Sequence, residues 1–282
     1  MPVKLGQSMT VVENSSSDIN WVSKDPAGNT WFNAKFSLYD FKAVETSDEI
    51  LAKRITQLLK ACARQDSEFL SQWKGQKVEM KLEFEREWGL GTSSTLVYCM
   101  AEWADANPYQ LLMDTFGGSG YDIACAGADG PIIYSLVDYA IEIQQADFKP
   151  KFADKLYFVY SGNKQDSQTE VSKYKSGAKD FKQEIKDISA ITEACEDCSA
   201  YNDFEKLMLE HENIVSKILK RKRIQEERFS DFKGTIKSLG AWGGDFILAM
   251  TELPEKELRD YFNQKGLSVV FKYEELILKR KA

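Results

Sequence analysis

Residues 85–96 read EREWGLGTSSTL, a turn with two glycines that joins two segments of different character. Before the turn, apolar residues from Val78 to Phe84 alternate with charged residues, which predicts a strand over residues 77–85 with one face on a core. After the turn, residues 95–104 have the pattern of a helix. The stretch therefore predicts a strand, a glycine turn and a helix in direct succession.

Such a turn has the chemistry needed to bind phosphate. Gly89 and Gly91 lack the Cβ atoms that would keep backbone amides away from a bound group. The free amides at a helix start, together with the helix dipole, favour an anion at that place. Thr92, Ser93 and Ser94 supply a helix cap and spare hydroxyls, one of which could reach a metal ion. The alternative is a tight corner with a serine cap and no ligand.

Two more glycine-rich turns follow. Residues 116–130 read FGGSGYDIACAGADG and carry Asp122, which is either a catalytic group or a turn-former that accepts a backbone amide. Residues 240–245 read GAWGGD and lie between two strand-like segments, 235–239 and 246–250. Three glycine turns in one chain strengthen the phosphate-binding interpretation.

Composition narrows the class of protein. The chain has 282 residues, 43% of them apolar, which suits one large globular domain or two of moderate size. A net charge of −7 argues against nucleic acid as the main partner. No segment has the length of apolar sequence that a membrane helix needs, and no signal peptide is recognisable, so a cytoplasmic protein is expected. The five scattered cysteines fit reduced thiols better than a disulfide framework.

The rest of the chain mixes helical and strand patterns without a repeat. Strands are expected at residues 7–13 and 30–38, with a polar turn region between them, and again at 155–160. Helical spacing of apolar residues predicts helices at residues 47–63, 177–198 and 202–228. A final αβ segment is expected at residues 254–273.

The order and content of the glycine turns resemble the GHMP kinases, the family of galactokinase, homoserine kinase, mevalonate kinase and phosphomevalonate kinase. GLGTSS at residues 89–94 resembles the family's phosphate loop, GSGYDIA at 118–124 its GxxD segment, and GAWGGD at 240–245 its third glycine motif. YSGNKQDSQTE at residues 160–170 is similar to a serine-containing loop near the substrate. The resemblance covers almost the whole chain and is nearest to the phosphomevalonate and mevalonate kinases.

This resemblance implies an α+β fold with two domains. Residues 1–150 would form the GHMP N-terminal domain, of the ribosomal protein S5 domain 2-like type, with a left-handed crossover. Residues 151–282 would form a ferredoxin-like C-terminal domain, with the active site between the two. The implied activity is ATP-dependent transfer of a phosphoryl group to an alcohol or phosphate, with mevalonate or phosphomevalonate as the expected acceptor in isoprenoid precursor synthesis.

The resemblance also implies roles for individual residues. Asp122 would be the catalytic acid-base group, and Ser94 would approach Mg²⁺. The ATP phosphates would be held by the first glycine turn, at Gly89, Leu90, Gly91, Thr92, Ser93 and Ser94. The acceptor would lie against the other glycine and serine turns, at Ser119, Gly120, Ser161, Gly162, Ser167, Gly243 and Gly244. The implied cofactors are ATP and Mg²⁺, and the implied partners are small molecules, with monomer and homodimer both left open.

Two departures from the family pattern leave alternatives open. The chain begins with MPVKLGQSMTV and lacks the family's PGK-like and GEY-like motifs, which predicts either a truncated sequence or an incomplete active site. The helical segment ANPYQLLMD has no glutamate where mevalonate kinases place a Mg²⁺ ligand, so Asp114 is either a substitute ligand or a solvated helix residue. The other functions considered are a GHMP-fold binding protein without kinase activity and a relative of mevalonate diphosphate decarboxylase.

Overall fold

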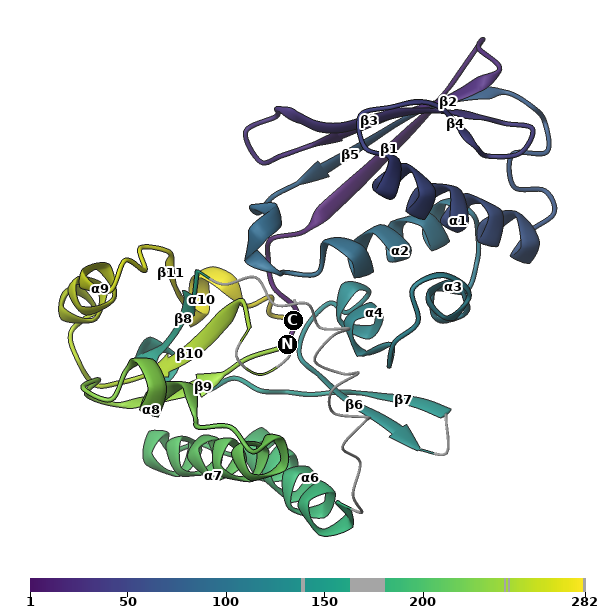
Figure 1. Cartoon of the computed structure of the whole chain (residues 1–282). Helices are drawn as coiled ribbons and strands as arrows, with labels where there is room; N and C mark the ends of the chain where they lie inside the picture. Colours follow the sequence, from purple (N-terminus) through teal and green to yellow (C-terminus); the bar gives the residue numbers. More distant parts are fainter. Residues whose placement is uncertain (138–139, 163–180, 241, 243, 281–282) are drawn as a thin grey trace.

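A computed structural model describes the chain except for residues 138–139, 163–180, 241, 243 and 281–282. Its described strands form two larger sheets and one hairpin, with helices packed on the sheets (Figure 1). The five-stranded sheet is built entirely from residues before 83, and the four-stranded sheet from residues after 155. The hairpin of β6 (Ile132–Val137) and β7 (Ala140–Gln145) lies between them in the sequence.

The first sheet has the strand order β1-β5-β2-β3-β4. Its parallel pair joins β2 to β5, with Trp21 opposite Val78, and the remaining pairs are antiparallel. The bounds of its strands are β1 Gln7–Asn14, β2 Asp18–Lys24, β3 Thr30–Ser37, β4 Ala43–Thr46 and β5 Gly75–Leu82.

Two helices, α1 (Glu49–Gln65) and α2 (Thr92–Trp103), cover one face of this sheet, and α3 (Pro108–Thr115) packs on both of them (Figure 1). The alternation along β5 is confirmed, since Val78, Met80, Leu82 and Phe84 are all buried. The expected helix near residues 47–63 is confirmed as α1, whose apolar face packs into the same core.

The prediction of a polar turn region between the first two strands is wrong in part, because this region contains a further strand, β2. Asp18–Lys24 alternates strictly in burial, and Ile19, Trp21 and Ser23 point into the core. Trp21 also satisfies its indole N–H locally, by donating to the Ser23 hydroxyl at 3.1 Å. The turn itself is confined to the few residues after β1.

The second sheet has the strand order β11-β8-β10-β9 and is covered on both faces. Alternate residues of β8 and β10 face opposite cores, so Phe158 and Leu248 pack with α6 and α7 while Val159 and Ile247 pack with α8 and α9. The bounds of its elements are β8 Leu156–Tyr160, β9 Thr235–Ser238, β10 Phe246–Met250, β11 Val270–Lys272, α6 Lys182–Glu196, α7 Tyr201–Leu219, α8 Ile224–Arg228, α9 Glu255–Gln264 and α10 Tyr273–Leu276.

One helix expected from the sequence is interrupted in the structure. The segment expected to be continuous over residues 202–228 divides into α7 and α8, because Lys220 adopts the left-handed conformation (φ 52°) and ends α7. The basic residues that follow are largely solvent-exposed. Part of the expected helix at 177–198 lies outside the described residues, and α6 accounts for the remainder.

Two expectations about the class of protein can be compared with the structure. All five cysteines are free, as expected for reduced thiols. In the described ranges, no helix combines the length and the apolar character that a membrane span requires.

The cap of α1 gives a direct test of how this fold is stabilised. The Asp48 carboxylate accepts hydrogen bonds from the amides of Ile50 (2.9 Å) and Leu51 (3.0 Å). We expect Asp48→Ala to lower the free energy of unfolding by about 1 kcal/mol, because these first-turn donors lose their acceptor. Asp48→Asn, which keeps an acceptor, serves as the control in urea denaturation. Equal losses in the two variants would contradict this account of the cap.

Candidate active site

The first glycine turn lies between the two large sheets. After β5, a short 3₁₀ turn over Arg86–Trp88 leads to Gly89 (φ 67°) and Gly91 (φ 88°), both in the left-handed region. Gly91 is the N-cap residue of α2, so the helix starts directly after the second glycine. The predicted succession of strand, glycine turn and helix is therefore confirmed.

The hydroxyls of this loop act differently from the cap that the sequence suggested. Among the described residues, no side chain caps the start of α2. The Ser94 and Thr95 hydroxyls instead donate to the Gly91 carbonyl, each at 2.9 Å. Within this part of the chain the first-turn amides have no side-chain acceptor, and the positive end of the helix dipole favours an anion.

Trp88 anchors the loop on the second sheet. Its ring packs edge-on against Phe271 with 5.4 Å between ring centroids, and it also contacts Phe246 and Tyr160. The Tyr160 hydroxyl donates to the carbonyl of Glu87 at 2.9 Å. Trp88 therefore packs the loop onto the C-terminal sheet.

The third glycine turn meets the first at Gly89. A Cβ atom added to Gly89 would lie 2.0 Å from the carboxyl carbon of Asp245, so any side chain there would force this carboxylate to move. Asp245 closes the GAWGGD motif, but its carboxylate was not among the site residues expected from the sequence. Only the spatial approach of two distant turns reveals it.

Ser161 and Gly244 also lie at this junction. The Ser161 hydroxyl donates to the Gly244 carbonyl at 2.7 Å, and the Ser161 amide donates to the Asp245 carbonyl at 2.8 Å. The Arg228 guanidinium donates to the Ser161 carbonyl at 3.2 Å. The structure thus brings Ser161 and Gly244 beside the first turn. Two other expected site residues, Ser167 and Gly243, lie outside the described residues.

The second glycine turn leads into a short helix, α4 (Tyr121–Ala126). Gly120 is its N-cap at φ 90°, and an added Cβ there would lie 3.2 Å from the Tyr109 ring. The Ser119 carbonyl accepts a hydrogen bond from the Tyr134 hydroxyl. These contacts hold the turn that presents Asp122.

Asp122 lies in the first turn of α4 and its side chain is solvent-exposed. Desolvation by the surrounding protein nevertheless raises its pKa above the usual value, while a hydrogen bond with Tyr121 opposes the rise. α4 packs on α2, since a Cβ at Gly127 would lie 2.5 Å from the Tyr98 ring. The helix that carries the first glycine turn therefore also supports the helix that carries Asp122 (Figure 1).

Comparisons with known proteins agree with this arrangement. The structure matches mevalonate kinase from Methanococcus jannaschii with a TM-score of 0.69 and 14% identity, over 98% of this chain and 89% of that one. It matches phosphomevalonate kinase from Streptococcus pneumoniae, solved with phosphomevalonate and AMPPNP, with a TM-score of 0.64 and 15% identity, over 94% and 90% of the two chains. The chain has the GHMP kinase fold.

Galactokinase from Lactococcus lactis, solved with galactose, shares this GHMP fold with a TM-score of 0.65 and 10% identity, over 99% of this chain and 87% of that one. No protein-family model matches the sequence, and no curated protein matches it. The α+β architecture expected from the three glycine turns is confirmed, while identities of 10–15% leave the substrate open.

Asp114 lies on α3, directly before the second glycine turn. It accepts a hydrogen bond from Gln110 at 2.7 Å and pairs with Arg64 at 3.9 Å, both on the surface of the helical layer. These partners support the solvated-residue interpretation over the substitute-ligand one. Among the described residues, no group of three or more His, Cys, Asp or Glu side chains is placed to hold a metal ion.

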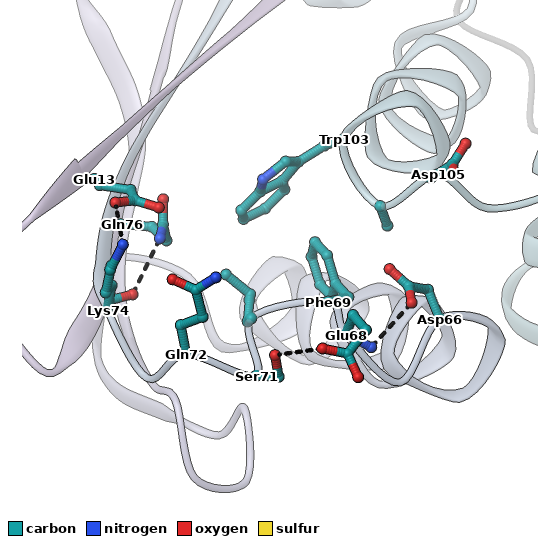
Figure 2. Close-up of a pocket in the computed structure, with 12 residues that line it drawn as sticks. Glu13, Asp66, Glu68, Phe69, Ser71, Gln72, Lys74, Gln76, Trp103 and Asp105 are labelled. Carbon is teal, nitrogen blue, oxygen red and sulfur yellow. Dashed lines mark hydrogen bonds and ion pairs between the residues drawn. The ribbon is translucent and has the colours of Figure 1, made fainter.

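A pocket of about 270 Å³ lies elsewhere on the N-terminal half, where α1 leads toward β5 (Figure 2). The Phe69 and Trp103 rings meet edge to face in it, and Glu13 pairs with Lys74 at 3.2 Å across its rim. None of the residues expected in the active site lines it. This pocket is therefore separate from the glycine turns.

The contact between Gly89 and Asp245 can be tested with a matched glycine. Gly240 has a similar φ (59°), but a Cβ there would meet nothing within 4 Å. We expect Gly240→Ala to cost about 1 kcal/mol of unfolding free energy from its left-handed backbone alone. Gly89→Ala should cost about 1 to 3 kcal/mol more because its methyl group overlaps the carboxylate.

Urea denaturation of both variants measures the difference. Adding Asp245→Gly to Gly89→Ala should recover the extra loss, because the overlapping carboxylate is then gone. Equal destabilisation by the two alanines would show that the carboxylate does not lie on Gly89.

Proposed function

We propose that the protein is an ATP-dependent kinase that transfers the γ-phosphoryl group of ATP to an alcohol or phosphate group of a small molecule. The observation that carries this proposal is the start of α2, where two left-handed glycines precede amides that no side chain caps. The fold supports it, since the structural neighbour from Streptococcus pneumoniae was solved with the ATP analogue AMPPNP.

The proposed phosphate site is the backbone from Gly89 to Ser94. Mg²⁺ bound with the nucleotide would neutralise phosphate charge, and such hard cations prefer oxygen ligands. The Ser94 hydroxyl and the Asp245 carboxylate supply oxygen atoms beside the loop, so these residues fit the ion. Asp245 thereby takes the place of the acidic ligand that the sequence analysis sought at Asp114.

Asp122 is proposed as the group that accepts the proton of the acceptor alcohol. As the alcohol oxygen forms its bond to the γ-phosphorus, the bond from that phosphorus to the ADP oxygen breaks and the hydroxyl proton passes to the Asp122 carboxylate. A carboxylate with a raised pKa is a better proton acceptor than an ordinary aspartate. Its solvent exposure leaves it open to a substrate.

Mevalonate or phosphomevalonate is the acceptor that we propose, which would place the enzyme in isoprenoid precursor synthesis in the cytoplasm. Neighbours that share the fold support this choice, because one was solved with phosphomevalonate and another with R-mevalonate. The proposed acceptor site combines the remaining turn residues, Ser119, Gly120, Ser161, Gly162, Ser167, Gly243 and Gly244. The proposed domains remain residues 1–150 and 151–282.

A coupled assay of ADP release tests the function. The protein is incubated with MgATP and, separately, mevalonate, phosphomevalonate, galactose and homoserine, with carbon dioxide release followed for mevalonate diphosphate. ADP release that depends on one acceptor supports the kinase and identifies its substrate. Nucleotide binding without acceptor-dependent release would instead support a binding protein of this fold.

The first functional prediction concerns the phosphate loop. Gly91→Val should abolish MgATP binding, since a branched side chain at φ 88° would have its Cβ only 2.7 Å from the Ser94 hydroxyl and would displace the first-turn amides. Calorimetry measures the affinity, and Gly28→Val, at the same φ of 88° in a distant turn, is the control. Unchanged MgATP affinity in folded Gly91→Val would overturn the phosphate site.

The second functional prediction concerns Asp122. We expect Asp122→Asn to lower kcat by roughly 10² to 10⁴ while nucleotide affinity stays within a few-fold. In the wild type, kcat/KM should fall at acidic pH as the carboxylate is protonated, and at a higher pH than for an ordinary aspartate because its pKa is raised. A fully active Asn variant, or one with a lowered melting temperature and intact turnover, would make Asp122 a turn-former only.

A further inference from the structure

A buried polar cluster lies under the third glycine turn, between α7 and β9. Its centre is Glu212, which has no solvent-exposed surface. The Trp242 indole N–H donates to Glu212 Oε1 at 2.9 Å, and the Lys237 ammonium lies 3.4 Å from the same oxygen. Trp242 of the third glycine turn is thus hydrogen-bonded to Glu212 of α7.

Two basic side chains complete the cluster. Lys237 Nζ lies 3.0 Å from His211 Nδ1. Burial and the neighbouring Lys237 lower the pKa of His211 to about 4, so the imidazole is neutral near pH 7 and its Nδ1 accepts. Burial also lowers the pKa of Lys237, while Glu212 acts in the opposite direction.

Stability alone does not account for this cluster. Burying an ion pair costs desolvation free energy, and apolar residues of similar size usually serve a core as well or better. Trp242 adds strain, because it is 8% exposed yet adopts the left-handed conformation at φ 53°, which is unusual for a bulky residue. Strain of this kind is retained where the backbone must be held in one place.

The backbone held here is part of the candidate active site. Gly244 lies two residues after Trp242, and its carbonyl accepts from the Ser161 hydroxyl at 2.7 Å. Asp245 follows and places its carboxylate on Gly89 of the phosphate loop. Because Trp242 lies only two residues before Gly244, we expect a shift of Trp242 to displace the residues that meet the phosphate loop.

We propose that Glu212 is a positioning residue that, through its hydrogen bond with Trp242, holds Gly244 and Asp245 against the phosphate loop. The inference rests on the proposed kinase function for its effect on turnover. The anchoring itself is a property of the fold and can be tested without ATP.

Trp242→Phe is the main test variant, because it keeps an aromatic ring and removes the indole donor together with the five-membered part of the indole ring. We expect kcat per folded molecule to fall roughly 10- to 100-fold, since small misplacements of a phosphate site have effects of this size. Glu212→Leu should lower kcat per folded molecule by a similar factor. Glu212→Gln keeps an acceptor for Trp242, and should retain turnover within about three-fold.

Trp21→Phe is the matched control, because it also removes a buried indole hydrogen bond, the one to Ser23, but in the first sheet. We expect it to lower stability without changing kcat per folded molecule. Amide hydrogen exchange of a peptide covering residues 244–250, in the absence of nucleotide, should become faster in Trp242→Phe and stay unchanged in Trp21→Phe.

These readouts separate the two proposals. A wild-type protein that neither binds nucleotide nor releases ADP would refute the kinase proposal, and faster exchange in Trp242→Phe would still support the anchor. Unchanged exchange at residues 244–250 in Trp242→Phe would refute the anchor even in an active kinase. Turnover as low in Glu212→Gln as in Glu212→Leu would also refute it, because the retained hydrogen bond would then have no effect.

Discussion

The close approach of the Asp245 carboxylate to the backbone of Gly89 is the constraint on which the rest of the candidate site depends. A side chain at position 89 would force this carboxylate to move, because a Cβ would lie 2.0 Å from the carboxyl carbon. The contact brings together turns that are more than 150 residues apart in the sequence. It also places a carboxylate beside the start of α2, whose first-turn amides no side chain of the described residues caps.

Two kinds of packing maintain this approach. Below the first turn, Trp88 lies among Phe246, Phe271 and Tyr160, and this aromatic contact sets the phosphate loop on the second sheet. Below the third turn, Trp242 is hydrogen-bonded to buried Glu212. In this chain both tryptophans act as supports beneath the loops.

Much of the fold followed from local pattern. The alternation along β5 and the helical spacing along α1 predicted those elements because one face of each packs on the same core. β2 was missed, since its short segment contains Asn, Ser and Asp, and only pairing with β3 and β5 makes it a strand. The break at Lys220 was missed as well, because a left-handed lysine leaves no local sequence signal.

For the site, the sequence by itself predicted the first turn and the chemistry that it offers: glycine is favoured where φ is positive, and helix-start amides favour anions. Only the tertiary structure decided that Ser161 lies beside Gly244 and that the Asp245 carboxylate lies at Gly89. The physical reason is that contacts between distant turns depend on how two sheets pack. That packing is set by many apolar side chains together and by no single motif.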